Sequence, residues 1–491
     1  MIIKTDPEII VSYLQDASHF KGNADKVYIP ETIEEIVEIM TDSFLKNIPV
    51  TISGAGTGLT GSRVPLSGNI ISTEKLNNII EINENEKYAI VQPAVLYNEF
   101  ESLLTPLGLF YAPNPTEKNS SLGGNVATNA SGAKTFKYGA TRSHVLGLKI
   151  VLADGSEVEL VRGKNFADNF HLTLMTKNHD KIEILLPNLS MPDIKHAAGY
   201  FIKPGMDAID LFIGSEGTLG IITEIKLKLL KSPEKVIGII SFFENETSLL
   251  DYVESVRDLS KINNLIDYKI NTQISTRLIE FFDKYSLNLL REDFPQIPES
   301  TYGAIWCEQE YSLENESIIL EEWYNKISKY TALSDSTWIA LTDSEHEKFR
   351  DFRHALPSKI VEINERNNQN KIGTDTAVPD RHFREYFRFL QNEYQKINLP
   401  FVTYGHIGNS HLHANIFVTN DFEYQKGLDY YSKCIAEALR LKGTISAEHG
   451  VGKLKKKYLE QMFGVHGISA MKNLKRILDP KFLLGRGTMF D

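Results

Sequence analysis

The sequence is poor in cysteine and in long apolar runs. Cys307 and Cys434 are its only cysteines among 491 residues, which excludes a disulfide framework and an iron–sulfur cluster with its four ligands. This scarcity favours an intracellular, reducing compartment. The sequence contains no run of 18 apolar residues, so it predicts no membrane span. The N-terminus MIIKTDPEII lacks the pattern of a signal peptide. We therefore expect a cytoplasmic protein, and peripheral contact with the inner face of a membrane is compatible with the sequence.

An excess of basic charge is also lacking. The chain carries 64 acidic against 53 basic residues, a net charge of −11. A general nucleic-acid binder needs a basic face to neutralise phosphates, so this class is disfavoured. The hydrophobic content of 42% provides a sizeable core, and the length predicts two to four domains.

Periodic patterns predict mixed helices and strands. Apolar residues at helical spacing follow a Thr32/Glu35 capping signal and predict a helix over 33–44. A tight turn at Asp154 and Gly155 predicts a hairpin over 145–161. Other predicted strands are 50–52, 86–94, 221–229, 236–242 and 301–307, and 95–104 is a predicted helix. Residues 162–200 look like a loop insertion.

A glycine-rich segment, SGAGTGLTGS over 53–62, contains the pattern G-x-G-x-x-G. In a Rossmann fold this loop opens a helix, but here SRVPLSG follows, which is no helix start. The glycines instead allow a tight bend whose N–H groups converge on an anion. A flexible surface turn is the alternative, but it leaves the hydroxyls of Thr57, Thr60 and Ser62 unexplained.

Two further segments rich in small residues occupy 113–132 and 214–223. Small side chains let the backbone approach a large, flat ligand closely. Each segment alone is weak evidence. Together with the loop over 53–62 they predict a long groove for a dinucleotide such as FAD.

Histidines concentrate in TYGHIGNSHLHAN over 403–415 and SAEHG over 446–450. Residues that alternate on a strand share one face. Two imidazoles and a carboxylate can hold a divalent metal with open positions, and a further histidine can act as a base. A lone histidine is usually structural, but five metal-capable side chains in two glycine-bounded segments favour a functional site. They are His406, His411, His413, Glu448 and His449.

In this order, SGAGTGLTG, SLGGNVATNASG, DLFIGSEGTLGIIT, TYGHIGNSHLHANIF and GTISAEHGVGKLKK resemble the vanillyl-alcohol oxidase flavoproteins, the PCMH type. More narrowly, the chain is similar to FAD-linked D-lactate dehydrogenases, glycolate oxidase flavin subunits and D-2-hydroxyglutarate dehydrogenases, over about 25–491. The resemblance implies an α+β fold. A PCMH-type FAD-binding domain of two α/β subdomains spans 25–232, and an α+β cap with an antiparallel sheet spans 233–442. A helical segment, 1–24, precedes them, and a C-terminal segment, 443–491, returns to the FAD site.

The resemblance also implies which residues contact FAD. The phosphates would be held by Gly54, Gly56, Thr57, Gly58, Thr60, Gly61 and Ser62. The ribityl, adenine or ring contacts would come from Pro115, Gly124, Thr128, Ser131, Glu216 and Ile222. Family members that tether FAD through this loop use a histidine there, and this loop has none. The FAD is therefore expected to be non-covalent.

For the metal, the resemblance implies zinc or manganese held by His406, His413 and Glu448, with His449 as the base and Asn415 as a substrate contact. The family carries D-G-N where this chain has Asn409-Ser410-His411. The role of His411 stays open between a substrate contact, a fourth ligand and a partner of a ligand.

A helix over 346–356 carries Arg350 and Arg353 on one face. Alone, this pattern is typical of a solvated helix surface. The resemblance implies that Arg353 binds the substrate carboxylate, for which a guanidinium is suited. Members that accept 2-hydroxyglutarate carry a lysine where this chain has Gly373, and Lys371 is two positions out of register. A short substrate, D-lactate, is thereby favoured. The basic run 453–457 is expected to be a solvated helix face.

We therefore expect metal-assisted oxidation of a D-2-hydroxy acid, D-lactate to pyruvate, with hydride transfer to flavin N5. Electrons would pass to an external quinone, cytochrome or electron-transfer flavoprotein, because the chain cannot hold an iron–sulfur relay. A D-2-hydroxyglutarate or glycolate dehydrogenase or oxidase is the near alternative. A flavin-dependent, ether-lipid-type transferase and a non-catalytic flavin-binding subunit are more distant ones. A homodimer is compatible with the sequence.

Overall fold

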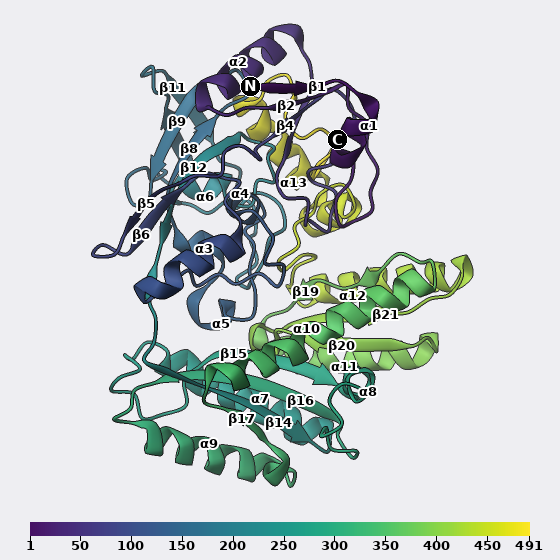
Figure 1. Cartoon of the computed structure of the whole chain (residues 1–491). Helices are drawn as coiled ribbons and strands as arrows, with labels where there is room; N and C mark the ends of the chain where they lie inside the picture. Colours follow the sequence, from purple (N-terminus) through teal and green to yellow (C-terminus); the bar gives the residue numbers. More distant parts are fainter. The chain divides into compact units, whose positions relative to one another are not determined.

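The computed structural model describes residues 1–491, and the chain forms two compact units (Figure 1). The first unit contains Met1–Ser131, Gly139–Ser232 and Ile445–Asp491, and the second contains Gly132–Tyr138 and Pro233–Thr444. None of the helices combines the length and the apolar character that a membrane span requires.

The first unit contains two larger sheets. One has the order β1-β2-β4-β3, formed by Ile2–Lys4, Lys26–Ile29, Asn69–Ser72 and Val50–Ser53. The other has the order β5-β6-β12-β8-β9, formed by Ile79–Asn83, Tyr88–Val91, Ile221–Lys228, Val145–Val151 and Glu157–Val161. In the first sheet β4 pairs in parallel with both β2 and β3, whereas the second sheet is antiparallel throughout.

Helix α2 (Ile33–Lys46) joins β2 to β3, as its sequence predicts. Thr32 caps it by accepting from the amide of Glu35 at 3.3 Å, and Asn47 ends it in the left-handed region. Its apolar stripe packs into a core with residues of β3, β4 and β8. Burial of this stripe fixes the position of β3, whose last residue, Ser53, is the first residue of the glycine-rich segment.

Two segments differ from the sequence-based expectations. Residues 162–200, expected to be a loop, contain a hairpin of β10 (His171–Met175) and β11 (Lys181–Leu185). Leu172 and Leu174 are buried while their neighbours are exposed, which is the alternation of a half-buried strand. The N-terminal segment begins with β1, and helical structure is confined there to α1 (Pro7–Ile10) and a 3-10 turn.

The second unit is built on an eight-stranded antiparallel sheet. Its path is β17-β14-β16-β15-β20-β21-β18, with β19 also paired to β21. In that order the strands are Trp338–Ala340, Lys235–Phe243, Gly303–Tyr311, Thr276–Asp283, Phe401–Gly405, His411–Ile416 and Ile372–Gly373, with β19 at Thr376–Ala377. The expected antiparallel sheet is therefore confirmed.

Helices cover both faces of this sheet. One core includes residues of α7 (Glu246–Asn263), α9 (Glu316–Tyr330), α11 (Asp380–Ile397) and α12 (Asp421–Arg440). The other includes residues of α8 (Lys284–Leu290) and α10 (Asp343–Arg366). Along β16, Ile305 and Cys307 belong to the first core and Ala304 and Trp306 to the second. The sheet is thus buried on both faces, and polar residues inside it need partners.

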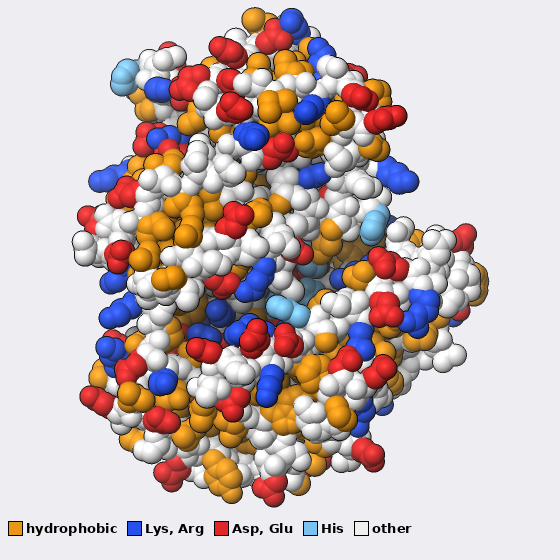
Figure 2. All heavy atoms as spheres, in the orientation of Figure 1, with side chains coloured by type: hydrophobic (Ala, Val, Ile, Leu, Met, Phe, Trp, Pro, Cys, Tyr) orange, Lys and Arg blue, Asp and Glu red, His pale blue; other side chains and the backbone are white.

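Surface charge is mixed in sign. On the face that Figure 2 shows, acidic and basic side chains are interspersed rather than gathered into one large patch. Many charged side chains of the protein form ion pairs: Arg384, for example, lies 2.7 Å from Asp251 and 2.7 Å from Glu254. Exposed pairs of this kind add little to stability, because solvent screens them.

Candidate functional site

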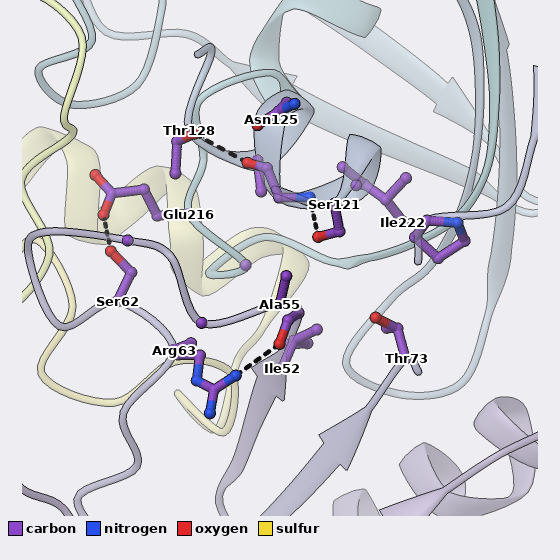
Figure 3. Close-up of a pocket in the computed structure, with 18 of the residues that line it drawn as sticks. Ile52, Ala55, Ser62, Arg63, Thr73, Ser121, Asn125, Thr128, Glu216 and Ile222 are labelled. Carbon is purple, nitrogen blue, oxygen red and sulfur yellow. Dashed lines mark hydrogen bonds between the residues drawn. The ribbon is translucent and has the colours of Figure 1, made fainter. Parts of the chain in front are cut away.

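A pocket in the first unit is lined by the three segments rich in small residues (Figure 3). Ten of the residues expected to contact FAD line it: Gly54, Gly56, Thr57, Gly58, Thr60, Ser62, Gly124, Thr128, Glu216 and Ile222. Gly61, Pro115 and Ser131, also expected to contact FAD, are not among its lining residues.

The glycine-rich segment forms an open loop and no helix follows it, as expected. Gly56 adopts φ +82°, and a Cβ there would lie 2.6 Å from Nη1 of Arg63. That same nitrogen donates to the carbonyl of Gly54 at 2.7 Å (Figure 3). Arg63, which we did not predict, therefore holds the loop in its bend, and the absent side chain at Gly56 makes room for it.

Glu216 braces this loop as well as lining the pocket. Its carboxylate accepts a hydrogen bond from Ser62 Oγ (Figure 3) and one each from the amides of Val451 and Gly452 at 2.8 Å. Burial raises the pKa of Glu216, although these hydrogen bonds oppose the shift. The residue ties the loop to the turn that follows His449 in sequence.

The basic run 453–457 was expected to be a solvated helix face, and this is wrong for two of its lysines. Lys453 and Lys455 are each only 7% exposed. Lys453 Nζ donates to the carbonyl of Gly61 at 3.1 Å and to Thr488 Oγ1 at 2.9 Å. Burial lowers the pKa of Lys453 to about 8. Both lysines precede α13, which begins only at Lys456, so they do not lie on a helix face. They anchor loops of the first unit instead.

The donors of this pocket fit a polar dinucleotide. Ser120 Oγ and Asn125 Nδ2 are buried pocket-lining atoms without a hydrogen-bond partner, which is costly unless a ligand satisfies them. A Cβ at Gly123 would lie 2.5 Å from Pro93, so only glycine permits this close packing of the wall. The residues present therefore suit FAD.

Three histidines lie together in the second unit. His411 and His413 alternate along β21, and His406 follows β20. Ring centroids are 4.5 Å apart for His411 and His413, and 5.3 Å apart for His406 and His411. One nitrogen from each ring lies within 4.8 Å of the others. Nitrogens bound to one zinc ion stand at most about 4.2 Å apart, so small side-chain movements suffice for these residues to fit a metal.

The backbone forces this grouping. Gly405 has φ +127°, and a Cβ there would lie 2.9 Å from the His413 ring. Ser410 adopts φ +53° at the other end of the turn. Register pairs Tyr404 with His413, so the ring of His406, just beyond β20, is brought back toward the β21 histidines.

Each histidine has a buried polar neighbour. Glu280 Oε1 lies 2.5 Å from Nδ1 of His406, and the carbonyl of Thr374 lies 3.3 Å from Nδ1 of His413. Burial raises the pKa of Glu280, but His406 and Arg353 outweigh it and hold the pKa at about 2. Such partners fix the ring orientation of metal-binding histidines. Glu280 was not predicted, because nothing in its local sequence marks it.

Arg353 lies on α10 and is only 7% exposed, whereas Arg350, three residues before it, is exposed. Arg353 donates through Nε to Glu280 Oε2 at 3.0 Å, and its Nη1 is buried without a partner. The guanidinium also lies 4.9 Å from the Tyr404 ring centroid. A solvated helix surface is therefore the wrong interpretation for Arg353. Its Nη1 can donate a hydrogen bond to a ligand.

Asn415 is buried on β21 opposite Gly373 of β18. Its Oδ1 has no hydrogen-bond partner, and a Cβ at Gly373 would lie 2.6 Å from this oxygen. The same Cβ would lie 3.1 Å from Cε of Lys371. Lys371 is thus out of register in sequence, but its side chain reaches the space beside Gly373.

Glu448 and His449 belong to the first unit. Glu448 Oε2 accepts from Ser131 Oγ at 3.0 Å and from Lys195 Nζ at 2.7 Å, while Nε2 of His449 lies 3.8 Å from Glu448 Oε1. Ser131, expected to contact FAD, thus contacts the expected metal ligand. Lys195 was not predicted, because it lies in the segment read as a loop insertion. The expected ligand set draws on both units.

Comparison with known proteins identifies the family. A model described as FAD binding domain matches residues 24–160, and one described as FAD linked oxidases, C-terminal domain, matches 262–489. Glycolate oxidase subunit GlcD of Bacillus subtilis is 29% identical, covering 97% of this chain and 92% of the relative. D-lactate dehydrogenase of Anaerostipes hadrus is 27% identical, covering 98% and 93%. D-2-hydroxyglutarate dehydrogenase of Stutzerimonas stutzeri is 26% identical, covering 99% and 96%.

Solved structures share the fold. p-Cresol methylhydroxylase with bound substrate gives a TM-score of 0.71 at 14% identity, covering 100% of this chain and 94% of that one. Alkyldihydroxyacetonephosphate synthase gives 0.65 at 15% identity, covering 98% and 81%. The PCMH-type FAD-binding fold is thereby confirmed. The chain belongs to the FAD-linked oxidoreductases of this flavoprotein superfamily, in the branch that includes the relatives named glycolate oxidase subunit, D-lactate dehydrogenase and D-2-hydroxyglutarate dehydrogenase.

Proposed function

We propose that this protein oxidises a D-2-hydroxy acid, D-lactate to pyruvate first, and passes the electrons to an external acceptor. The observation that carries the proposal is the buried, unpartnered Nη1 of Arg353 in the same unit as the histidine cluster. A guanidinium donor of this kind suits a carboxylate, and the imidazoles suit a divalent ion that a hydroxyl can approach.

Each residue of the proposed site has one role in the reaction. Arg353 Nη1 binds the substrate carboxylate, and Glu280 holds the guanidinium through Nε. His406, His413 and Glu448 would hold zinc or manganese. A bound ion would supply Lewis acidity that lowers the pKa of the substrate hydroxyl, and FAD would supply the acceptor for the hydride from the substrate Cα. His449 takes the hydroxyl proton, because a histidine titrates near neutral pH.

The amide of Asn415 serves the substrate oxygens. It is buried and its Oδ1 is unpartnered, so the substrate hydroxyl can donate a hydrogen bond to it. FAD is held without a covalent bond, since no histidine occurs in the loop over 53–62. Both cysteines are single, buried and free, so the chain cannot hold an iron–sulfur relay of its own. The electron acceptor is therefore external: a quinone, a cytochrome or an electron-transfer flavoprotein.

A second substrate, D-2-hydroxyglutarate, is supported by Lys371. Its Cε lies close to the space above Gly373 and Asn415, and an ammonium there can pair with a distal carboxylate. Against this, Lys371 is exposed, so its long side chain would lose entropy and solvation on pairing. A monocarboxylate therefore stays the first choice.

Anaerobic bleaching of the bound flavin tests the proposal. The FAD- and metal-loaded protein is mixed with D- and L-isomers of lactate and 2-hydroxyglutarate and with glycolate, with and without chelator. We expect D-lactate to bleach the flavin and chelator to prevent it. Bleaching by D-2-hydroxyglutarate alone would change the substrate, and no bleaching by any acid would overturn the proposal.

A further inference from the structure

His411 and Asp375 form a pair that the proposed reaction does not yet use. Nε2 of His411 lies 3.1 Å from Oδ1 of Asp375, and both side chains are completely buried. Moving a carboxylate away from water is costly unless a charged or hydrogen-bonding partner compensates for it. A pair that only filled the core could be replaced by apolar side chains at little cost, so its presence beside the other histidines calls for a further role.

The surroundings of His411 are those of a metal ligand. Its ring centroid lies 4.5 Å from that of His413 and 5.3 Å from that of His406, and one nitrogen of each ring falls within 4.8 Å of the others. Histidines that bind metals almost always present their second nitrogen to a carboxylate, a carbonyl or water. Asp375, Glu280 and the carbonyl of Thr374 supply such a partner to His411, His406 and His413 respectively.

The turn before β21 is built to hold His411 in place. Ser410, with φ +53°, donates through Oγ to Asp380 Oδ1 at 2.6 Å and accepts from Arg257 Nη1 at 3.1 Å. Arg257 is itself 3% exposed. This buried brace fixes the backbone immediately before His411, so the ring has little freedom to leave the cluster.

We propose that His411 is a third imidazole ligand, bound through Nδ1 and oriented by Asp375, so that the second unit alone presents three nitrogen donors to the ion. The inference rests on the proposed function only in taking the ion to be the same one. A nitrogen-rich set favours zinc and similar borderline metals, whereas manganese prefers oxygen donors. The ion is therefore zinc rather than manganese.

Metal affinity, measured without substrate, tests this. The FAD-loaded full chain is stripped of metal and titrated with Zn²⁺ or Mn²⁺ against a competing chelator. We expect His411→Asn to weaken Zn²⁺ binding by at least about tenfold and to weaken Mn²⁺ binding less, so that the preference for zinc falls. Asp375→Asn should weaken Zn²⁺ binding in the same direction. Unchanged Zn²⁺ affinity in His411→Asn would overturn the inference.

His346 provides the matched control. It is another buried histidine of the second unit, and its Nε2 lies 3.1 Å from the carbonyl of Val236, outside the cluster. His346→Asn should leave the Zn²⁺ affinity unchanged. Equal weakening in both variants would mean that loss of any buried histidine loosens the unit, which would overturn the specific role of His411.

A measurement on the unmodified protein keeps the inference testable if the variants do not fold. With Co²⁺ in place of zinc, each ligating histidine gives one paramagnetically shifted imidazole N–H signal. Three such signals support the three-imidazole set and two contradict it. Failure of the proposed function is separable: if no hydroxy acid bleaches the flavin but His411→Asn binds Zn²⁺ weakly, the reaction is wrong and the metal site stands.

Discussion

Arg353 donates to Glu280 at 3.0 Å inside the second unit, and the two side chains are 8% and 0% exposed. The other oxygen of Glu280 faces His406. One carboxylate therefore orients both the arginine proposed to bind the substrate and a histidine proposed to bind the metal. Mutations of Glu280 should affect both functions at once, because Glu280 contacts both Arg353 and His406.

Arg353→Lys should impair substrate binding. A lysine cannot reproduce the planar fork that reaches Glu280 through Nε and leaves Nη1 for a carboxylate. We expect kcat/KM for D-lactate to fall about 100-fold, mainly through a higher KM, as loss of a charge-assisted hydrogen bond of roughly 3 kcal/mol implies. Arg350→Lys, on the same helix but exposed, should leave steady-state kinetics unchanged. Equal effects of the two would contradict the assignment.

Glu280→Gln should destabilise the protein. It leaves the buried charge of Arg353 uncompensated, which typically costs about 3–5 kcal/mol. Urea unfolding followed by tryptophan fluorescence measures this loss. A double variant, Glu280→Leu with Arg353→Met, removes both charges and should recover most of the stability without recovering activity. A double variant as unstable as Glu280→Gln would show that packing, not charge, holds this region.

Asp283 should make stability depend on pH. It caps α8, accepts from the amides of Ser286 and Thr403 at 2.7 and 2.9 Å, and burial raises its pKa to about 7. An unfolded aspartate ionises near pH ~3.9, so between these values the folded state binds more protons and its stability falls as pH rises.

Asp283→Asn removes this titration while keeping a good helix cap. The difference in unfolding free energy, variant minus parent, should rise by roughly 2 kcal/mol between pH 5 and pH 8. It is measured by unfolding both proteins at each pH. A constant difference across this range would show that Asp283 is ionised in the folded protein at pH 5.

Gly452→Ala should loosen the flavin pocket. Gly452 has φ +53°, and a Cβ there would lie 2.0 Å from the carbonyl of Thr60 in the glycine-rich loop. The loop would have to move, and we expect the FAD dissociation constant to rise at least about tenfold, with a loss of stability above about 1 kcal/mol. Flavin fluorescence titration measures the first effect.

Gly163→Ala is the matched control for this substitution. Gly163 also has a positive φ, +83°, but a Cβ there meets no atom within 4 Å. Its cost should be limited to backbone strain of about 1 kcal/mol, and FAD affinity should not change. Loss of flavin in both variants would point to strain rather than to the contact with Thr60.

Lys371→Ala separates the two substrates. If D-lactate is the substrate, its kcat/KM should stay within about twofold of the parent value, because no second carboxylate needs a partner. If D-2-hydroxyglutarate is the substrate, kcat/KM for it should fall by about tenfold or more, the loss expected for a charge-assisted pair. Comparison of both acids in one assay decides between them.

Local sequence was sufficient for the parts of the fold and site that depend on neighbouring residues. The cap of α2 and the bend of the glycine-rich loop follow from a few adjacent side chains, and His411 and His413 share a strand face because they alternate. The hairpin β10–β11 was missed because its short strands carry polar and exposed residues, although Leu172 and Leu174 alternate correctly.

Partners that come from distant segments could not be predicted. Glu280 precedes Arg353 by 73 positions, and Lys195 precedes Glu448 by 253, so only the fold brings them together. Lys453 and Lys455 show the opposite limit, because their charge alone indicated a solvated face. Lys453 is buried because the carbonyl of the distant Gly61 accepts from it, and Lys455 because the hydroxyl of Ser446, nine residues before it, does so.

The end of the sequence has a consequence for biosynthesis. Val50 donates to the carbonyl of Leu483 and accepts from Gly485, and Met489 donates to Gly452, while Gly485 also lines the flavin pocket. During translation β3, the strand that leads into the glycine-rich loop, can form these hydrogen bonds only after residues more than four hundred positions later have been made. Flavin uptake should therefore be a late, post-translational event.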